Sequence, residues 1–303
     1  MSAARAASTA PPLSVIIATT RAWPTSQDGL LSLRGQLAAV GGELIVMDGC
    51  GRGLPADAAT RWPEVRWEVA PGASVFELRA QGIARATGAV VGITEDHCGA
   101  DPRWVERTLA AHRAHPQAAA VAGPVLNGSV RAVSDWASFL VTFGPFLPPM
   151  RRAEQRVPPH SNISYKRWAL PLQPPESGWL EAHLAPGLLG AGAIVSDDAI
   201  QVTHYQTRSF ISSVRSHFHN GRATSGLIAR HHDHPKAWDR VKESLRHGRV
   251  LLGETLRSTW ARPGMRRWAV ACAPAIALIV GFFTAGRVLG DLAGPGRSLD
   301  ELY

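Results

Sequence analysis

The chain has 303 residues, of which 45% are hydrophobic and 18% are charged. This composition is sufficient for the packed core of one large or two small domains, and it excludes a globally disordered chain. The 32 Lys and Arg residues against 24 Asp and Glu residues give a formal net charge of +8. Such a balance suits partners rich in phosphate: nucleotides, nucleic acid or anionic lipid.

The N-terminal residues and the cysteines indicate the cellular compartment. Residues 1–12 are rich in Ala, Ser and Pro, which predicts a flexible tail without a secretory signal. The three cysteines, Cys50, Cys98 and Cys272, are scattered and odd in number. They make neither a metal knuckle nor a disulfide framework, so we expect a reducing compartment.

Short apolar runs alternate with helical stretches over the first part of the chain. The runs predict strands at residues 13–19, 43–48, 65–69, 89–94 and 118–122. Helices are predicted at about 28–40, at 74–87 behind a capping box of Ser74 and Glu77, and from Asp101-Pro102 to just before Pro116. This alternation predicts an α/β fold with a mostly parallel sheet and helices on both faces.

Polar residues follow three of the predicted strands. They are Thr19-Thr20, Asp48-Gly49 and Glu95-Asp96-His97. Because ligands of parallel sheets bind beyond the carboxyl ends of the strands, we expect these groups in one crevice. Glu, Asp and His are ligands for Mn²⁺ or Mg²⁺, and the imidazole favours Mn²⁺. A solvated turn that contains a histidine by chance explains the same spacing.

Several other site classes lack their motifs. The sequence has no G-x-G-x-x-G after a strand, no Walker loop, no H-E-x-x-H and no G-x-S-x-G elbow. The basic stretch from Arg208 to Arg267 contains too few aromatic residues for a nucleic-acid surface. We therefore expect no nucleic-acid partner.

Five motifs in order resemble a family-2 glycosyltransferase with the GT-A fold, of the membrane-associated bacterial type. The motifs are SVIIATT, ELIVMDG, the R-x-x-G-I-A-R-A-T-G helix, ITEDH and D-P-R-W, and the resemblance covers about residues 13–205. It implies a glycosyltransferase of the hexosyltransferase type (EC 2.4) that uses a nucleotide-diphosphate sugar as donor. Departures are Ala18 for the usual Pro, Ala86 for the usual Asn, and Glu95 and His97 for the flanking aspartates.

The resemblance also implies roles for individual residues. Thr19 and Thr20 line the nucleotide pocket, Asp48 hydrogen-bonds the base, and Arg79 lies near the donor phosphates. Glu95, Asp96 and His97 replace the acidic cluster that holds the metal and the donor diphosphate. His204 ends a late strand, 202–204, and is a further metal-ligand candidate, although a histidine there is as often structural. His217, His219 and Arg222 are candidates for extra pyrophosphate contacts.

The catalytic base is expected downstream of His160–Arg167, a segment that resembles the acceptor-side strand of the family. Glu181 is the candidate, and Glu176 is the second choice. An inverting transfer needs one carboxylate to deprotonate the acceptor hydroxyl. A lone glutamate is more often an ordinary surface residue, so that reading stays open.

The last hundred residues have a membrane-like pattern. Trp268–Gly286 contains no charged residue, and Arg262, Arg266 and Arg267 precede it. We predict a glycosyltransferase domain at 13–208, a basic amphipathic region at 209–266, a transmembrane or membrane-embedded helix at 267–290 and a short tail at 291–303. A buried core helix is the alternative. The basic flank predicts a cytoplasmic catalytic domain on the cell inner membrane.

These interpretations give a lipid-linked or saccharide acceptor and membrane lipids as further partners. The amphipathic region has Trp238, Val241, Leu245, Leu252 and Leu256 on one helical stripe.

An alternative function is a non-catalytic glycosyltransferase-like protein that binds a nucleotide or lipid at the membrane. The altered acidic motif motivates this alternative.

Overall fold

A computed structural model describes residues 10–21, 27–52, 57–150, 159–171, 194–206, 208–231, 236–299 and 301. The chain folds into two compact units. The sheet unit comprises Met1–Val125 and Pro148–Thr203, and the helical unit comprises Leu126–Leu147 and His204–Tyr303.

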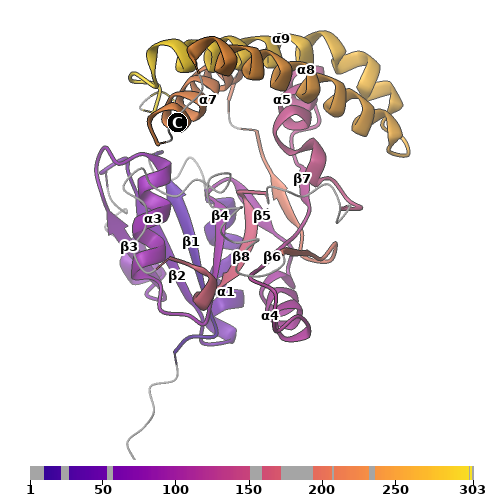
Figure 1. The fold of residues 1–303 in the computed structure, drawn as a ribbon. Coiled ribbons are helices and arrows are strands. Elements are labelled where there is room, and N and C mark those ends of the chain that lie inside the picture. The colour runs from indigo at the N-terminus through magenta and orange to yellow at the C-terminus, as the bar shows by residue number, and fades with distance from the viewer. Residues whose placement is uncertain are drawn as a thin grey trace, which may run out of the picture. The chain divides into compact units, whose positions relative to one another are not determined.

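The sheet unit is built on seven strands in the order β3-β2-β1-β4-β8-β6-β9 (Figure 1). They are β1 (Leu13–Thr19), β2 (Glu43–Asp48), β3 (Val65–Val69), β4 (Val90–Glu95), β6 (Ala120–Ala122), β8 (Asn162–Lys166) and β9 (Ile194–Ser196). β8 is antiparallel to β4 and β6, and the other neighbouring pairs are parallel. The predicted mostly parallel α/β fold is confirmed.

Helices cover both faces of this sheet because β1 and β2 are apolar on both sides. Ile16 and Ala18 belong to the core cluster under α3 (Val75–Arg85). Ile17, between them in sequence, faces Leu30 of α1 (Asp28–Ala39) on the other side. Successive strand residues point to opposite faces, so a run such as LSVIIAT is buried throughout.

Helix α3 starts at the predicted capping box and lies close to the sheet. Ser74 Oγ accepts a hydrogen bond from the Glu77 amide at 3.3 Å, and Glu77 Oε2 accepts one from the Ser74 amide at 2.8 Å. At Gly82 a Cβ atom would stand 2.5 Å from Ile16 Cγ2. Glycine at this position therefore allows the helix to approach β1.

Helix α4 (Trp104–Ala114) begins later than predicted. The Asp101 carboxylate accepts hydrogen bonds from the Arg103 amide at 2.9 Å and from Arg107 Nη1 at 2.8 Å. Asp101 therefore closes a turn and pairs with Arg107, and the prediction that it caps the helix is wrong. The helix ends before Pro116, as predicted.

Short elements complete the sheet unit and its connections. They are α2 (Ala58–Arg61), the 3-10 turn η3 (Arg167–Ala169), and a three-stranded sheet of order β5-β10-β7. Its strands are β5 (Cys98–Ala100), β7 (Val125–Asn127) and β10 (Val202–His204). The chain passes from one unit to the other within β7 and β10. β10 is the predicted late strand.

The helical unit contains α5 (Val133–Phe143), the 3-10 turn η1 (Gly144–Phe146), α7 (Phe210–His231), α8 (Ala237–Ala261) and α9 (Arg266–Ala293). Glycines bring α7 and α9 into backbone contact. A Cβ on Gly221 would stand 2.1 Å from the Phe283 carbonyl oxygen, and one on Gly286 would stand 2.0 Å from that of Phe218. Among the described helices, α9 is the one long and apolar enough to cross a membrane.

Helix α8 packs through a different face from the predicted apolar stripe. Its buried residues are Val241, Ser244, Gly248, Thr255 and Thr259. Trp238 and Leu245, which belong to the predicted stripe, are exposed. Small residues are needed on the buried face because α9 is close: a Cβ on Gly248 would stand 2.1 Å from Thr284 Oγ1.

Candidate functional site

The carboxyl ends of β1, β2 and β4 lie at one edge of the sheet. The strand register pairs Thr19 with Asp48 and Ala18 with Glu95. The side chains of four of these residues are buried: Thr19, Asp48, Glu95 and Asp96. Thr20, which follows Thr19 in the sequence, is half-buried. The structure therefore brings together the three strand-end groups that the sequence singles out.

Asp96 links the end of β4 to the end of β1. Its Oδ2 accepts a hydrogen bond from Thr19 Oγ1 at 2.7 Å. The Arg21 amide donates to the same Thr19 hydroxyl oxygen at 3.2 Å. The backbone oxygen of Asp96 accepts from the Gly29 amide at the start of α1, at 3.0 Å. The acidic residue thus fixes two loops beside the crevice.

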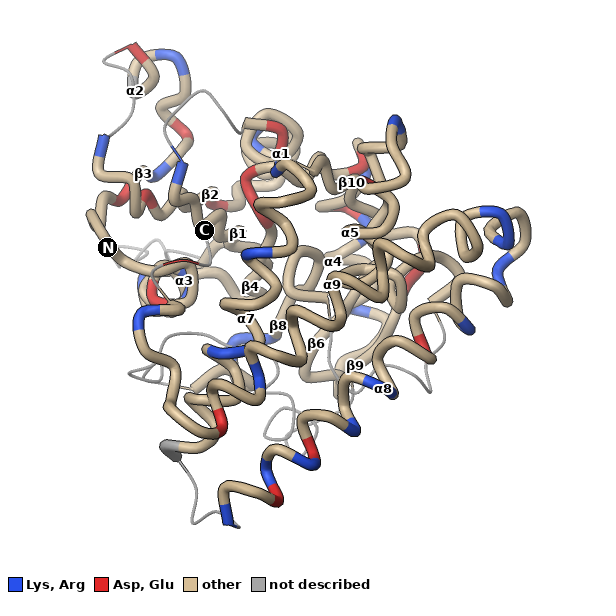
Figure 2. The backbone as a smooth tube through the Cα atoms, turned by 90° about the horizontal axis from the view of Figure 1, so that it is seen from above, with Lys and Arg blue, Asp and Glu red and all other residues tan. Residues whose placement is uncertain are grey.

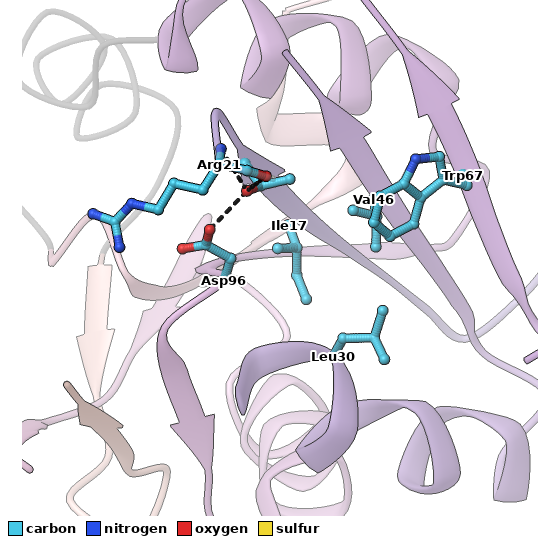
Figure 3. A pocket seen from close by; sticks show the side chains of 7 residues that line it. Ile17, Arg21, Leu30, Val46, Trp67 and Asp96 are labelled. Carbon is cyan, nitrogen blue, oxygen red and sulfur yellow. Dashed lines mark hydrogen bonds between the residues drawn. The ribbon is translucent and has the colours of Figure 1, made fainter. Parts of the chain in front are cut away.

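A small pocket opens next to these contacts (Figure 3). Ile17, Leu30, Val46 and Trp67 form its apolar wall, and Thr19, Arg21 and Asp96 form its polar side. Figure 3 shows the Arg21 and Asp96 side chains on the same side of the pocket, opposite Trp67. The pocket therefore combines an apolar wall that contains an indole ring with a polar side that contains an acid and a guanidinium group.

Asp48 is held by the loop that follows β2. Its Oδ1 accepts hydrogen bonds from the Cys50 amide at 2.8 Å and the Gly51 amide at 3.3 Å. The Gly49 amide donates to the Thr19 carbonyl at 2.8 Å, which joins this loop to the end of β1. The carboxylate therefore has a fixed orientation at the strand end.

Glu95, Asp96 and His97 contact one another. Asp96 Oδ1 lies 2.5 Å from His97 Nδ1, and Glu95 Oε2 lies 3.5 Å from His97 Nε2. The His97 side chain is 13% exposed. Each ring nitrogen thus faces one carboxylate.

Glu95 also contacts two basic side chains. Arg79 Nη2 donates to Glu95 Oε1 at 3.2 Å, and this guanidinium is 1% exposed. His160 Nε2 lies 3.4 Å from the same oxygen. Behind them, burial, with Glu95 and Asp96 adding to it, raises the pKa of the Cys98 thiol well above its ordinary value. Cys98 is therefore a neutral core group.

The donor set fits a divalent cation that accepts both oxygen and nitrogen. Glu95 Oε2 and His97 Nε2 face each other, and the Asp96 contact at Nδ1 orients the imidazole. A carboxylate on the second ring nitrogen is the usual support of a metal-bound histidine. One carboxylate and one imidazole match Mn²⁺ better than Mg²⁺, which prefers oxygen ligands alone.

The remaining predicted site residues have contacts of their own. Arg79, expected near the donor phosphates, is buried against Glu95. His204 ends β10 in the helical unit, where its ring packs 4.6 Å from that of Phe143 between centroids. Its role as a metal ligand stays a prediction. Glu181 and Glu176 lie outside the described residues.

The candidates for extra pyrophosphate contacts lie in α7 and have partners within the helical unit. His217 Nδ1 lies 2.8 Å from the Ser213 carbonyl oxygen, and burial lowers the pKa of this histidine. His219 Nδ1 lies 3.1 Å from Ser298 Oγ. Arg222 Nε donates to the Gly294 carbonyl at 3.2 Å. These contacts join α7 to α9 and to the segment after it.

Two residues of the site escaped the sequence reasoning. Arg21 follows Thr19-Thr20 directly, and a cation just past a strand end was a usable signal. His160 begins the recognised segment before β8, but its contact with Glu95 joins residues 65 positions apart. No local pattern reports such a contact.

Comparison with solved structures finds a similar fold in a mannosyltransferase. No protein-family model matches the sequence, and no curated protein matches it. The chain is similar to the solved mannosyltransferase PcManGT from Pyrobaculum calidifontis in complex with GDP-Man and Mn²⁺. The TM-score is 0.56 and the identity 14%, over 94% of this chain and 88% of that one. S. aureus TarS 1-349 in complex with UDP-GlcNAc aligns at a TM-score of 0.48 and 12% identity, over 93% and 92% of the two chains. At 14% identity the first similarity establishes the fold: this chain shares the architecture of a nucleotide-sugar mannosyltransferase.

Proposed function

We propose that this protein is a metal-assisted, inverting family-2 glycosyltransferase of the hexosyltransferase type. It transfers a sugar from a nucleotide-diphosphate sugar to a lipid-linked or saccharide acceptor at the cytoplasmic face of the cell inner membrane. The observation that carries the proposal is the set of Thr19, Asp48, Asp96 and His97 at one strand edge, in a fold shared with a mannosyltransferase solved with GDP-Man and Mn²⁺.

The donor nucleotide is bound by the ends of β1 and β2. Asp48, fixed by the Cys50 and Gly51 amides, accepts a hydrogen bond from the base. Thr19 and Thr20 line the nucleotide pocket. Arg21, beside Asp96 at the pocket, pairs with a donor phosphate. Arg79 supports this site indirectly, because it holds Glu95.

Glu95 and His97 are the proposed metal ligands, with Asp96 as the residue that positions the imidazole. The prediction that Asp96 itself binds the metal is less favoured, because both of its oxygens have partners within the chain. His204 is proposed as a further ligand. Held by these residues, Mn²⁺ or Mg²⁺ would neutralise charge on the diphosphate leaving group.

Glu181 is the proposed base. It takes the proton from the acceptor hydroxyl as that oxygen bonds to the anomeric carbon of the sugar. The bond from this carbon to the donor phosphate breaks on the opposite face, and the nucleoside diphosphate leaves with the bonding electron pair. The sugar therefore changes configuration once, which defines inversion.

A second candidate has its own supporting observation. Arg79 forms an ion pair with Glu95 and can balance its charge without a metal. A non-catalytic module that binds a nucleotide or lipid at the membrane would need only this charge balance and no metal.

Thermal shift with UDP- and GDP-sugars, with and without Mn²⁺, tests donor binding, and release of nucleoside diphosphate tests turnover. The glycosyltransferase proposal expects both binding and turnover. Binding without release, with every acceptor class tried, would favour the non-catalytic module.

A further inference from the structure

Helix α9 has two faces of opposite character. Every exposed position from Val270 to Ala293 is apolar: Val270, Ala271, Pro274, Ala277, Leu278, Gly281, Phe282, Ala285, Leu289, Leu292 and Ala293. We call this set the apolar stripe. Its members recur at helical spacing, so they form one continuous face. At about 1.5 Å per residue the stripe is about 35 Å long.

The opposite face of α9 is joined to the other helices at both ends. Near its start, Trp268 stacks on Trp136 of α5 with ring centroids 4.9 Å apart. Near its end, Asp291 Oδ2 accepts a hydrogen bond from Ser244 Oγ of α8 at 2.6 Å, and the Asp291 carbonyl accepts one from Arg240 Nη2 at 2.8 Å. Asp291 is buried, so separating α9 from α8 would break the Ser244 bond to its carboxylate and the Arg240 bond to its carbonyl.

Helix α8 carries charged side chains along its whole length. They are Asp239, Arg240, Lys242, Glu243, Arg246, Arg249, Glu254 and Arg257. Figure 2 shows these coloured residues along α8 beside the tan length of α9. If α9 crossed a bilayer within this bundle, many of these charges would enter hydrocarbon, which is strongly unfavourable. The packing of α9 therefore argues against a membrane-spanning orientation.

We propose that α9 lies in the plane of the membrane, with its apolar stripe in one leaflet of an anionic bilayer and both of its ends on the same side. The inference deepens the proposed membrane association, and it concerns a different part of the chain from the sugar-transfer site. The proposed occupant of the stripe is lipid.

The surroundings of the helix start favour an anionic lipid surface over a second copy of the chain. Arg266 stacks on Trp260 at 5.7 Å, and Arg267 stacks on Trp268 at 5.6 Å, measured from the guanidinium carbon to the ring centroid. Arg262 precedes them in sequence. Cations beside indole rings, next to an apolar face, suit the headgroup layer of an anionic membrane. Two copies meeting through this face would bring the same cations of each chain to a shared interface.

Vesicle flotation of the full chain, without donor, tests lipid binding. We expect binding to phosphatidylglycerol–phosphatidylcholine vesicles and weaker binding to phosphatidylcholine alone. The double variant Leu278→Asp/Phe282→Asp should bind the anionic vesicles at least about tenfold more weakly, since it places charge on the lipid-facing surface. Leu31→Asp is the matched control, because Leu31 is 47% exposed in the sheet unit and Leu278 is 46% exposed.

The charge-removing variant Arg266→Gln/Arg267→Gln leaves the apolar stripe intact and should weaken binding to anionic vesicles alone. Unchanged flotation of both double variants would overturn the proposal. So would a wild-type dimer that does not float, because a second copy would then cover the stripe.

Thiol labelling tests the orientation. Ala261→Cys and Arg297→Cys, each in a Cys50→Ser background, place a reporter before and after α9. In inverted inner-membrane vesicles an impermeant maleimide should label both sites, and in intact cells it should label neither. Labelling of one site from each side would mean that α9 spans the membrane, which contradicts the inference. Nucleotide release, measured separately in detergent, reports on the proposed reaction and does not depend on this result.

Discussion

Asp96 Oδ1 lies 2.5 Å from His97 Nδ1, while Asp96 Oδ2 accepts the Thr19 hydroxyl. Both carboxylate oxygens are therefore used within the chain. A carboxylate at one ring nitrogen fixes the proton there and directs the lone pair of the other nitrogen outward. In the proposed metal site, Asp96 would therefore orient His97 so that its Nε2, the proposed ligand atom, faces Glu95.

Asp96→Asn should weaken Mn²⁺ binding by about 10- to 100-fold, because an amide supports the imidazole less well than a carboxylate does. Isothermal titration with Mn²⁺ measures the change. Asp101→Asn is the control, since Asp101 is a carboxylate of the same unit that pairs with Arg107 away from His97. Equal Mn²⁺ affinities of the Asp96 variant and the wild type would count against the positioning role.

The buried pair of Arg79 and Glu95 predicts a stability effect that is separable from metal binding. Glu95→Gln removes a carboxylate that pairs with a guanidinium 1% exposed, and this should cost about 3–5 kcal/mol of unfolding free energy. Arg79→Met together with Glu95→Gln should recover much of that loss, since no unpaired charge remains. Chemical denaturation measures both effects.

The same double variant should still fail to bind Mn²⁺, because the Glu95 ligand is gone. Independent, additive stability losses from the two single substitutions would show that Arg79 and Glu95 do not act as a pair.

His112 predicts how stability depends on pH. It is buried beside Ser164, and burial, with Lys166 adding to it, lowers its pKa from 6.5 to about 4. The unfolded chain then binds more protons between about pH 4 and pH 6.5. The stability that neutral His112 contributes is therefore fully present above pH 6.5. This contribution falls, by up to about 3 kcal/mol, as the pH drops to about 4.

Denaturant titrations at several pH values test this contribution. His112→Gln should flatten the curve between pH 4 and pH 6.5. An unaltered pH dependence in that variant would assign the loss to other groups.

Gly82 on α3 and Gly35 on α1 form a matched pair of helical glycines. A Cβ at Gly82 would meet Ile16 Cγ2 at 2.5 Å, whereas one at Gly35 would meet no atom within 4 Å. Gly82→Ala should destabilise by about 1–3 kcal/mol through overpacking. Gly35→Ala should stabilise by about 0.5–1 kcal/mol through helix propensity. Thermal melts of the two variants that shift in the same direction would refute the packing argument.

The strands at 13–19, 43–48 and 65–69 were predictable to the residue, because the first two are short apolar runs and the third alternates apolar with polar residues. The start of α4 was not, since Asp101 serves equally well as a helix cap and as a turn residue. Strands of three residues, such as β5 and β7, carry too little periodicity to be recognised.

The side-chain contacts in the candidate site could not be predicted from the sequence for a different reason. The sequence located Glu95 and Asp96 at a strand end, but the partners Arg79 and His160 come from other elements. The buried face of α8 was similarly hidden, because its Ser, Gly and Thr residues pack only where another helix comes close. The local sequence pattern predicts which apolar residues are buried. It does not predict contacts between residues that are far apart in the sequence.

The central claim is metal-dependent sugar transfer from a nucleotide-sugar at the Asp96–His97 crevice. Its most direct test is nucleoside diphosphate release from UDP- and GDP-sugars with and without Mn²⁺, by wild type, Asp96→Ala and Asp101→Ala. We predict Mn²⁺-dependent release by wild type and Asp101→Ala, and none by Asp96→Ala that remains folded by circular dichroism. Wild-type release rates in the Asp96→Ala variant would contradict the account.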